Sequence, residues 1–213
     1  MLLIFDLDGT VLDTYPLIRE TFIQLFERFL PEYQYDETDL QSFFGPGLLD
    51  TFTKIGCNEE KAKHLFREYR KLNANLQPKY LRMFPDTREV LQALKDRGHK
   101  MAILSNKINE AITSNLKQMN LLSFFDLIIG IDQVKKPKPN REGINLIKKM
   151  LNVEKCIYIG DTKTDMATAI NAGIDGIGVG WALTSKEDLL AAGAKYVASD
   201  MKDLLKIVRD NYV

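Results

Sequence analysis

The chain has 213 residues, and 29 Lys and Arg balance 29 Asp and Glu, so its formal net charge is zero. A neutral chain lacks the concentrated basic field that binding to a phosphate backbone requires, so we expect no nucleic-acid partner. Its 45% hydrophobic and 27% charged residues are ordinary globular values, which argue against a disordered chain. No apolar run approaches the ~20 residues that span a bilayer, and the first ten residues lack signal-peptide features. We therefore expect a soluble, cytoplasmic protein with no membrane partner.

Short apolar runs recur along the chain and predict its strands. Each run is continuous rather than alternating, which is typical of strands buried on both faces of a parallel sheet. The runs are LLIF (2–5), MAILS (101–105), LIIGI (127–131), CIYIG (156–160) and GIGVG (176–180). Helical patterns lie between them, one predicted to be capped by Asp86 and another by Asn140. Alternating strands and helices predict an α/β core with a doubly wound parallel sheet.

Residues 14–81 interrupt this alternation because they contain no convincing strand. Their apolar periodicity instead predicts helices, and Pro31, the 45–47 turn and Gly56 are plausible breaks between them. We therefore predict an α/β catalytic core formed by 1–13 and 82–213, with an inserted all-helical cap at 14–81.

The residues that carry chemistry follow the predicted strands. Ligands of open α/β sheets bind beyond the carboxyl ends of the strands, so side chains that follow different strands gather at one edge. Four of the predicted strands are followed by such residues: Asp6 and Asp8, Ser105 to Lys107, Asp132 and Lys136, and Asp161 and Asp165.

These residue types suit phosphoryl transfer. Crowded carboxylates repel one another unless a cation joins them, and hard oxygen ligands select Mg²⁺, here between Asp6 and Asp161. Ser105 can donate a hydrogen bond to a phosphate oxygen, and Lys136 can neutralise charge on the transferring group. Asp8 is free to act as a general acid and then as a general base.

The nucleophile follows by elimination. The two cysteines and the two histidines are isolated in the sequence, so we predict no Ser-His or Cys-His pair. Asp6 is then the most economical nucleophile, acting through an aspartyl-phosphate.

Four segments, DLDGT (6–10), Ser105-Asn106, Lys136-Pro137 and GDxxxD (160–165), resemble in order and spacing the motifs of the haloacid dehalogenase (HAD) superfamily. The resemblance covers essentially the whole chain, and the inserted helical block is similar to the cap of the phosphoglycolate phosphatase-like branch. It implies a HAD-like Rossmannoid core.

The resemblance also implies a role for each motif residue. Asp6 would be the nucleophile and a metal ligand, and Asp8 would be the acid/base and give its backbone carbonyl to the metal. Asp161 would be a metal ligand, and Asp165 a ligand or a supporting carboxylate. The predicted phosphate-binding residues are Ser105, Asn106 and Lys136, and the predicted metal ligands are Asp6, Asp8, Asp161 and Asp165.

The function expected from these residues is a Mg²⁺-dependent phosphatase that acts on a small phosphorylated metabolite, with a phosphoglycolate-like monoester as the first candidate. An inorganic pyrophosphatase and a β-phosphoglucomutase-like phosphomutase are the alternatives, and a sugar phosphate is also an open substrate. Asp8 argues against a dehalogenase, and the order of the acidic motifs disfavours a response-regulator receiver. We expect a monomer or a weak homo-oligomer.

Overall fold

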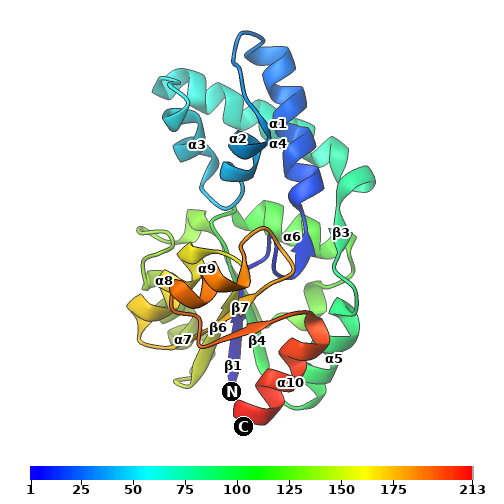
Figure 1. Cartoon of the computed structure of the whole chain (residues 1–213), viewed down its shortest axis with the longest axis vertical. Helices are drawn as coiled ribbons and strands as arrows, with labels where there is room; N and C mark the ends of the chain where they lie inside the picture. Colours follow the sequence, from blue (N-terminus) through cyan, green and yellow to red (C-terminus); the bar gives the residue numbers. More distant parts are fainter. Residues whose placement is uncertain (213) are drawn as a thin grey trace. The chain divides into compact units, whose positions relative to one another are not determined.

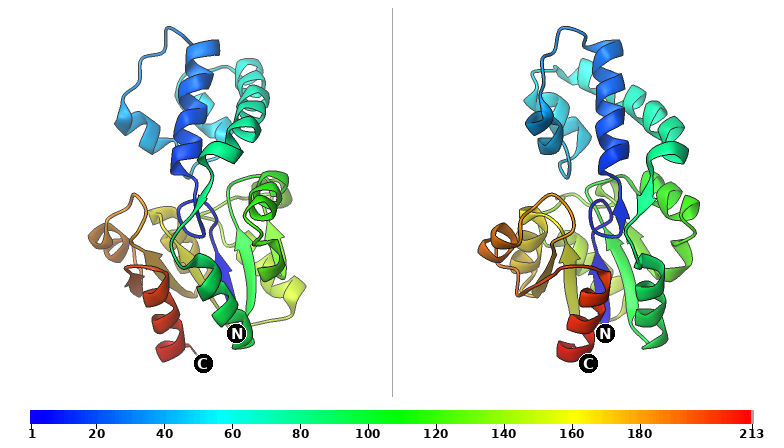
Figure 2. Two further views of the ribbon diagram at one scale, coloured as in Figure 1. Left: turned by 90° about the vertical axis from the view of Figure 1, so that its right-hand side faces the viewer. Right: turned by 45° about the vertical axis from the view of Figure 1, so that its right-hand side comes forward.

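The computed structural model describes residues 1–212, and these form two compact units (Figures 1 and 2). Residues 1–13 and 83–212 form an α/β unit, and Thr14–Arg82 form a helical unit. A short two-stranded sheet pairs β2 (Leu12–Asp13) with β3 (Arg82–Met83), the segments at which the chain leaves and re-enters the α/β unit. The sequence prediction placed the inserted segment at 14–81.

The α/β unit is built on a parallel sheet. Within residues 1–212, six strands form this sheet in the order β5-β4-β1-β6-β7-β8. They are β1 (Leu2–Phe5), β4 (Lys100–Leu104), β5 (Leu127–Ile129), β6 (Cys156–Gly160), β7 (Asp175–Val179) and β8 (Tyr196–Ala198). The predicted doubly wound sheet is confirmed, while β8 was not among the predicted strands because its run of three residues is short.

Helices cover both faces of this sheet (Figure 2). Leu2 and Ile4 of β1 pack with Ile144 of α7 and Ala169 of α8 in one apolar cluster. The helices α5 and α10 contact each other and lie on the opposite face. The helices of this unit are α5 (Thr87–Asp96), α6 (Asn109–Gln118), α7 (Glu142–Leu151), α8 (Lys163–Ala172), α9 (Lys186–Ala191) and α10 (Met201–Asn211), with short 3₁₀ turns η1 (Leu122–Phe124) and η2 (Ile131–Gln133).

The two predicted helix caps had different outcomes. Asp86 precedes α5 but has a left-handed backbone (φ 61°), and its side chain makes no capping hydrogen bond. Asp86 is therefore the N-cap residue by position, as predicted, but its carboxylate lies 3.1 Å from the Lys202 ammonium instead of accepting a helix N–H. Asn140 lies one residue before the N-cap of α7, yet its side-chain oxygen accepts a hydrogen bond from the Glu142 N–H at 2.9 Å.

The helical unit has its own aromatic core around Phe22. This ring is fully buried and lies within 4.9–6.1 Å, between ring centroids, of Phe26, Phe43, Phe52 and Tyr69. The unit contains α1 (Tyr15–Phe29), α2 (Glu37–Ser42), α3 (Leu48–Lys54) and α4 (Glu59–Tyr80).

Helix length and polarity also bear on membrane insertion. Among residues 1–212, no helix combines the length and the apolar character needed to cross a bilayer.

We predict that Phe22→Ala lowers the free energy of unfolding by about 3–5 kcal/mol, because it removes the ring around which the other aromatic side chains pack. Arg28→Ala, an exposed position on the same helix, should change it by less than about 0.5 kcal/mol. Urea unfolding followed by circular dichroism measures both values. Equal effects of the two substitutions would show that the helical unit does not depend on this cluster.

Candidate active site

The register of the sheet brings three strand ends together around β1. Phe5, the last residue of β1, pairs with Ile103 of β4 and with Ile159 of β6. The next residue, Asp6, therefore lies level with the ends of both neighbouring strands. Parallel pairing predicts that the residues following β1, β4 and β6 lie at one edge of the sheet, and this register confirms it for the described residues.

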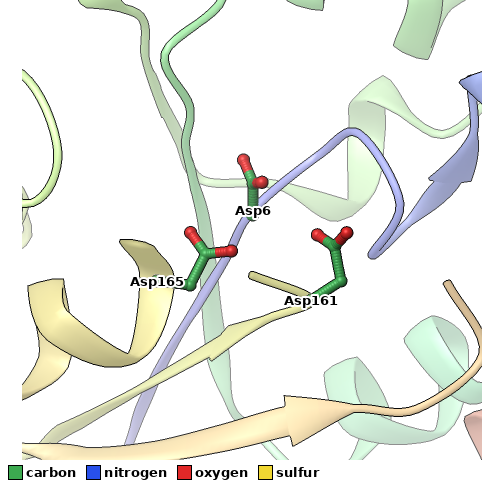
Figure 3. Close-up of side chains that lie close together, drawn as sticks. All are labelled: Asp6, Asp161 and Asp165. Carbon is green, nitrogen blue, oxygen red and sulfur yellow. The ribbon is translucent and has the colours of Figure 1, made fainter. Parts of the chain in front are cut away.

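Asp6, Asp161 and Asp165 form a buried carboxylate cluster at this edge (Figure 3). Each can offer one oxygen that lies within 4.8 Å of the others. Asp6 follows β1, Asp161 follows β6, and Asp165 lies in the first turn of α8. Side chains so crowded and shielded from water carry a high electrostatic cost unless cations compensate them.

Local hydrogen bonds orient two of these carboxylates. Thr10 donates its hydroxyl to Asp161 Oδ1 at 3.1 Å. Asp165 Oδ2 accepts the Thr162 N–H at 2.9 Å and the Thr162 hydroxyl at 2.6 Å, within a capping box at the start of α8. The capping box of Thr162 and Asp165 therefore both begins α8 and fixes the orientation of the Asp165 carboxylate.

Gly160 leaves the space that Asp165 occupies. A Cβ placed on Gly160 would overlap the Cβ and Cγ of Asp165. The glycine of the GDxxxD segment is thus required by close approach between the end of β6 and α8, with no need for an unusual backbone conformation.

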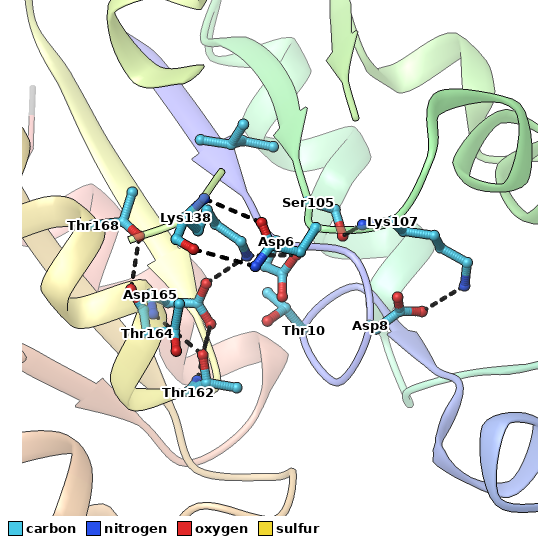
Figure 4. A network of polar contacts seen from close by, with 12 residues as sticks. Asp6, Asp8, Thr10, Ser105, Lys107, Lys138, Thr162, Thr164, Asp165 and Thr168 are labelled. Carbon is cyan, nitrogen blue, oxygen red and sulfur yellow. Dashed lines mark hydrogen bonds and ion pairs between the residues drawn. The ribbon is translucent and has the colours of Figure 1, made fainter. Parts of the chain in front are cut away.

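Lys138 is the cation of this cluster (Figure 4). Its Nζ lies 3.0 Å from Asp6 Oδ1 and 2.7 Å from Asp165 Oδ1, and it donates to the Tyr158 hydroxyl at 3.1 Å. The Asn106 side chain holds the Lys138 backbone, since its Oδ1 accepts the Lys138 N–H at 3.1 Å. Asn106, a predicted phosphate-binding residue, therefore also contacts the loop that carries this lysine.

The lysine that meets Asp6 is Lys138 and not Lys136, which corrects the sequence prediction. The Lys136 side chain is exposed, and its backbone N–H donates to Glu142 Oε2 at 3.1 Å. The segment KKPKP holds two Lys-Pro pairs, Lys136-Pro137 and Lys138-Pro139. Both pairs fit the motif. The hydrogen bond from the Lys138 backbone to Asn106 distinguishes the lysine at the site from Lys136.

Asp8 and Ser105 both contact Lys107, which follows β4 two residues after Ser105. Lys107 Nζ lies 2.9 Å from Asp8 Oδ1, and the side chains of both residues are about one-seventh exposed. The backbone N–H of Lys107 donates to Ser105 Oγ at 3.3 Å. The Asp8 carboxylate is therefore paired outside the cluster of Asp6, Asp161 and Asp165, as Figure 4 shows.

Burial dominates the protonation of the cluster. Desolvation raises the pKa of Asp6 to about 7, although Lys138 opposes the shift. Desolvation, with Asp165 and Asp6 nearby, also raises the pKa of Asp161 well above its usual value. Burial alone would lower the pKa of Lys138, but the attraction of Asp165 and Asp6 outweighs it and holds the lysine charged.

The cluster fits a divalent cation. Among residues 1–212, the buried Asp161 Oδ2 has no hydrogen-bond partner, which is costly for a carboxylate oxygen that nothing else binds. The three carboxylates face the single ammonium of Lys138, so a doubly charged ion with a preference for oxygen ligands would complete the charge balance.

We predict that Lys138→Met lowers the free energy of unfolding by about 3–5 kcal/mol, since it leaves Asp6 and Asp165 buried without their cation. Lys136→Met should change it by less than about 0.5 kcal/mol. Chemical denaturation of the two variants beside the parent protein gives the comparison. If Lys136→Met lowered the free energy of unfolding more than Lys138→Met does, Lys136 would be the cation that compensates the carboxylate cluster.

The chain also matches known proteins along nearly its whole length. A family model described as haloacid dehalogenase-like hydrolase matches residues 3–179. A protein named pyrophosphatase PpaX from Listeria monocytogenes is 36% identical over 210 residues, which cover 98% of this chain and 96% of the relative. A protein of the same name from Bacillus cereus is 32% identical over 209 residues, covering 97% of this chain and 95% of the relative.

Solved structures agree with this relationship. The structure of a predicted phosphatase from Clostridium acetobutylicum superposes with a TM-score of 0.87 at 26% identity, covering 98% of each chain. A HAD-like family hydrolase from Streptococcus pneumoniae superposes with a TM-score of 0.83 at 25% identity, covering 96% of each chain. The chain therefore belongs to the haloacid dehalogenase-like hydrolases, as its motifs predicted, and is an enzyme of the phosphatase type within that family.

Proposed function

We propose that this enzyme uses Mg²⁺ to hydrolyse inorganic pyrophosphate, and that the phosphoryl group passes through Asp6. The observation that carries the proposal is the buried Asp6 carboxylate, whose Oδ1 lies 3.0 Å from the Lys138 ammonium inside a cluster of acids able to bind a metal. A carboxylate held in one orientation by a fixed cation is well placed to act as a nucleophile.

In the first step, an oxygen of Asp6 forms a bond to phosphorus as the bond from phosphorus to the leaving oxygen breaks. Asp8 donates a proton to that leaving oxygen, which departs as phosphate when the substrate is pyrophosphate. The Ser105 hydroxyl, directly after β4 at the same sheet edge, is the proposed donor to a transferred phosphoryl oxygen. Lys138 holds the Asp6 carboxylate in place and offsets the negative charge around it.

In the second step, Asp8 accepts a proton from a water molecule as that water attacks the phosphorus of the aspartyl-phosphate. The bond between phosphorus and Asp6 breaks, phosphate leaves, and the carboxylate is restored. One residue thus serves as acid and then as base, while the nucleophile lies two positions away on the same strand end.

The residues that would hold Mg²⁺ are Asp6 and Asp161, with Asp165 in support. The free Oδ2 of Asp161 supports this assignment, whereas both oxygens of Asp165 already contact Lys138 or Thr162. When bound, the ion supplies positive charge that draws the phosphate dianion toward the acids and stabilises its transferring group. The backbone carbonyl of Asp8 remains a predicted further ligand.

Pyrophosphate is proposed ahead of a phosphoglycolate-like monoester because of the relatives. The proteins named pyrophosphatase are 32–36% identical and cover nearly the whole chain. Two solved structures described as phosphoglycolate phosphatases are 19% and 24% identical to this chain, which supports a shared fold alone. The relatives thus favour inorganic pyrophosphatase, which was one of the alternatives left open by the sequence.

Rates with Mg²⁺ on pyrophosphate, phosphoglycolate and glucose 1-phosphate test the substrate, and we expect the highest kcat/KM for pyrophosphate. Asp6→Asn should lower kcat at least about 1,000-fold, because an amide cannot form the aspartyl-phosphate. Asp210→Asn, an exposed acid on α10, should leave kcat unchanged. Full activity of Asp6→Asn would rule out the nucleophile, and a higher kcat/KM for another substrate would replace pyrophosphate.

We also predict that Mg²⁺ stabilises the protein more strongly as pH rises. Because the folded-state pKa of Asp6 is raised to about 7 and that of Asp161 is also raised, the metal-free folded state binds more protons than the unfolded state from about pH 4 to about pH 7. Stability contributed by these groups therefore falls as pH rises through that window. Mg²⁺ binds the ionised carboxylates, so its affinity and the stability that it adds rise as these groups lose their protons.

Thermal unfolding at about pH 5 and about pH 8, with and without Mg²⁺, measures this effect. The rise in Tm on adding Mg²⁺ should be larger at the higher pH, and Asp161→Asn should reduce it at both. A rise that is the same at both values would contradict the link between metal binding and the buried acids.

A further inference from the structure

Lys107 is the second lysine that reaches a site acid. Among residues 1–212, the ammonium groups that pair with Asp6, Asp8, Asp161 or Asp165 are those of Lys138 and Lys107. Lys138 is enclosed, with Asp6, Asp165 and Tyr158 all around its Nζ. Lys107 has one such contact, to Asp8, and its side chain is 15% exposed.

Resting on the proposed function, we propose that Lys107 determines the class of leaving group and selects one that carries its own negative charge. A phosphate, as released from pyrophosphate, is such a group, and a carboxylate-bearing alcohol is another. In the view of Figure 4, Lys107 and Asp8 lie on one side of Asp6 and Lys138 lies on the other.

The position of Asp8 locates the leaving group. The acid that protonates the leaving oxygen must contact it, and Lys107 Nζ lies 2.9 Å from that same carboxylate. The leaving oxygen can contact either oxygen of the carboxylate, so it lies within ~8 Å of the Lys107 ammonium. The other oxygens of a leaving phosphate extend from this point and come within reach of the ammonium.

Lys107 also has donors left for this purpose. An ammonium carries three N–H groups, and Asp8 takes one of them. The pair is shielded enough that its charges are weakly screened, yet exposed enough that a ligand can approach. A neutral leaving group would gain nothing from this cation.

The charge balance of the site points the same way. Lys138 and a divalent ion together offset Asp6, Asp161 and Asp165, while Lys107 offsets Asp8. As the general acid of the first step, Asp8 is neutral while it carries the proton that it will donate to the leaving oxygen. In that form the charge of Lys107 is uncompensated, and an anionic leaving group compensates it.

The test is the ratio of kcat/KM for pyrophosphate to kcat/KM for phenyl phosphate, measured in the parent enzyme and in Lys107→Met. Both leaving groups need a proton, but phenol carries no separate negative charge. We expect the ratio to fall by about 10- to 100-fold, the effect of losing a hydrogen bond to a charged group. Because both rates come from the same folded molecules, partial misfolding does not alter the ratio. Lys107→Gln provides a second variant.

Lys195→Met is the control, since Lys195 also forms an ion pair with an acid, Asp175 at 2.7 Å, but on the exposed surface of the same unit. It should keep the parent ratio. An unchanged ratio in Lys107→Met would overturn the proposal, whether the two rates fall together, as for a lysine that only positions Asp8, or neither falls.

The proposed substrate can fail separately. If the parent enzyme hydrolyses phenyl phosphate but not pyrophosphate, the proposed function is wrong, and phosphoglycolate replaces pyrophosphate in the ratio. Its leaving group carries a carboxylate, so the same fall is expected for Lys107→Met. A constant ratio in that comparison would overturn the role of Lys107 itself.

Discussion

The buried ammonium of Lys138 is the interaction on which the geometry of the site depends. It lies between Asp6 and Asp165, which come from different elements and would repel each other without it. Removing carboxylates from water costs several kcal/mol for each ion, and a cation at hydrogen-bonding distance recovers part of that cost. Lys138 thereby links the end of β1 to the first turn of α8 and opposes the rise in the pKa of Asp6 that burial causes.

The surrounding fold serves this arrangement. β1 is the strand between β4 and β6, so the residue after its last paired position lies between two other strand ends. Gly160 allows α8 to approach closely enough for Asp165 to join the cluster. Asp8 leaves the same strand end but pairs with Lys107, so two acids separated by a single residue have different surroundings and can take different chemical roles.

Much of this could be predicted from the sequence, because continuous apolar runs specify buried parallel strands and parallel strands share an edge. Asp6, Asp161 and Asp165 follow from that reasoning alone. The choice between Lys136 and Lys138 does not, since both precede proline and the deciding contact with Asn106 is made across the fold. The sequence also places Asp86 at the start of α5, but local patterns do not reveal its left-handed backbone or a distant partner such as Lys202.

The central claim is that Asp6 carries the phosphoryl group. Rapid acid quenching of the enzyme with radiolabelled pyrophosphate and Mg²⁺, followed by peptide mapping, tests it most directly. The account predicts label on the peptide that contains Asp6, stable in acid and released by hydroxylamine, as expected of an acyl phosphate. Label on a different residue, or turnover in which phosphate forms in a pre-steady-state burst with no label on the protein, would contradict it.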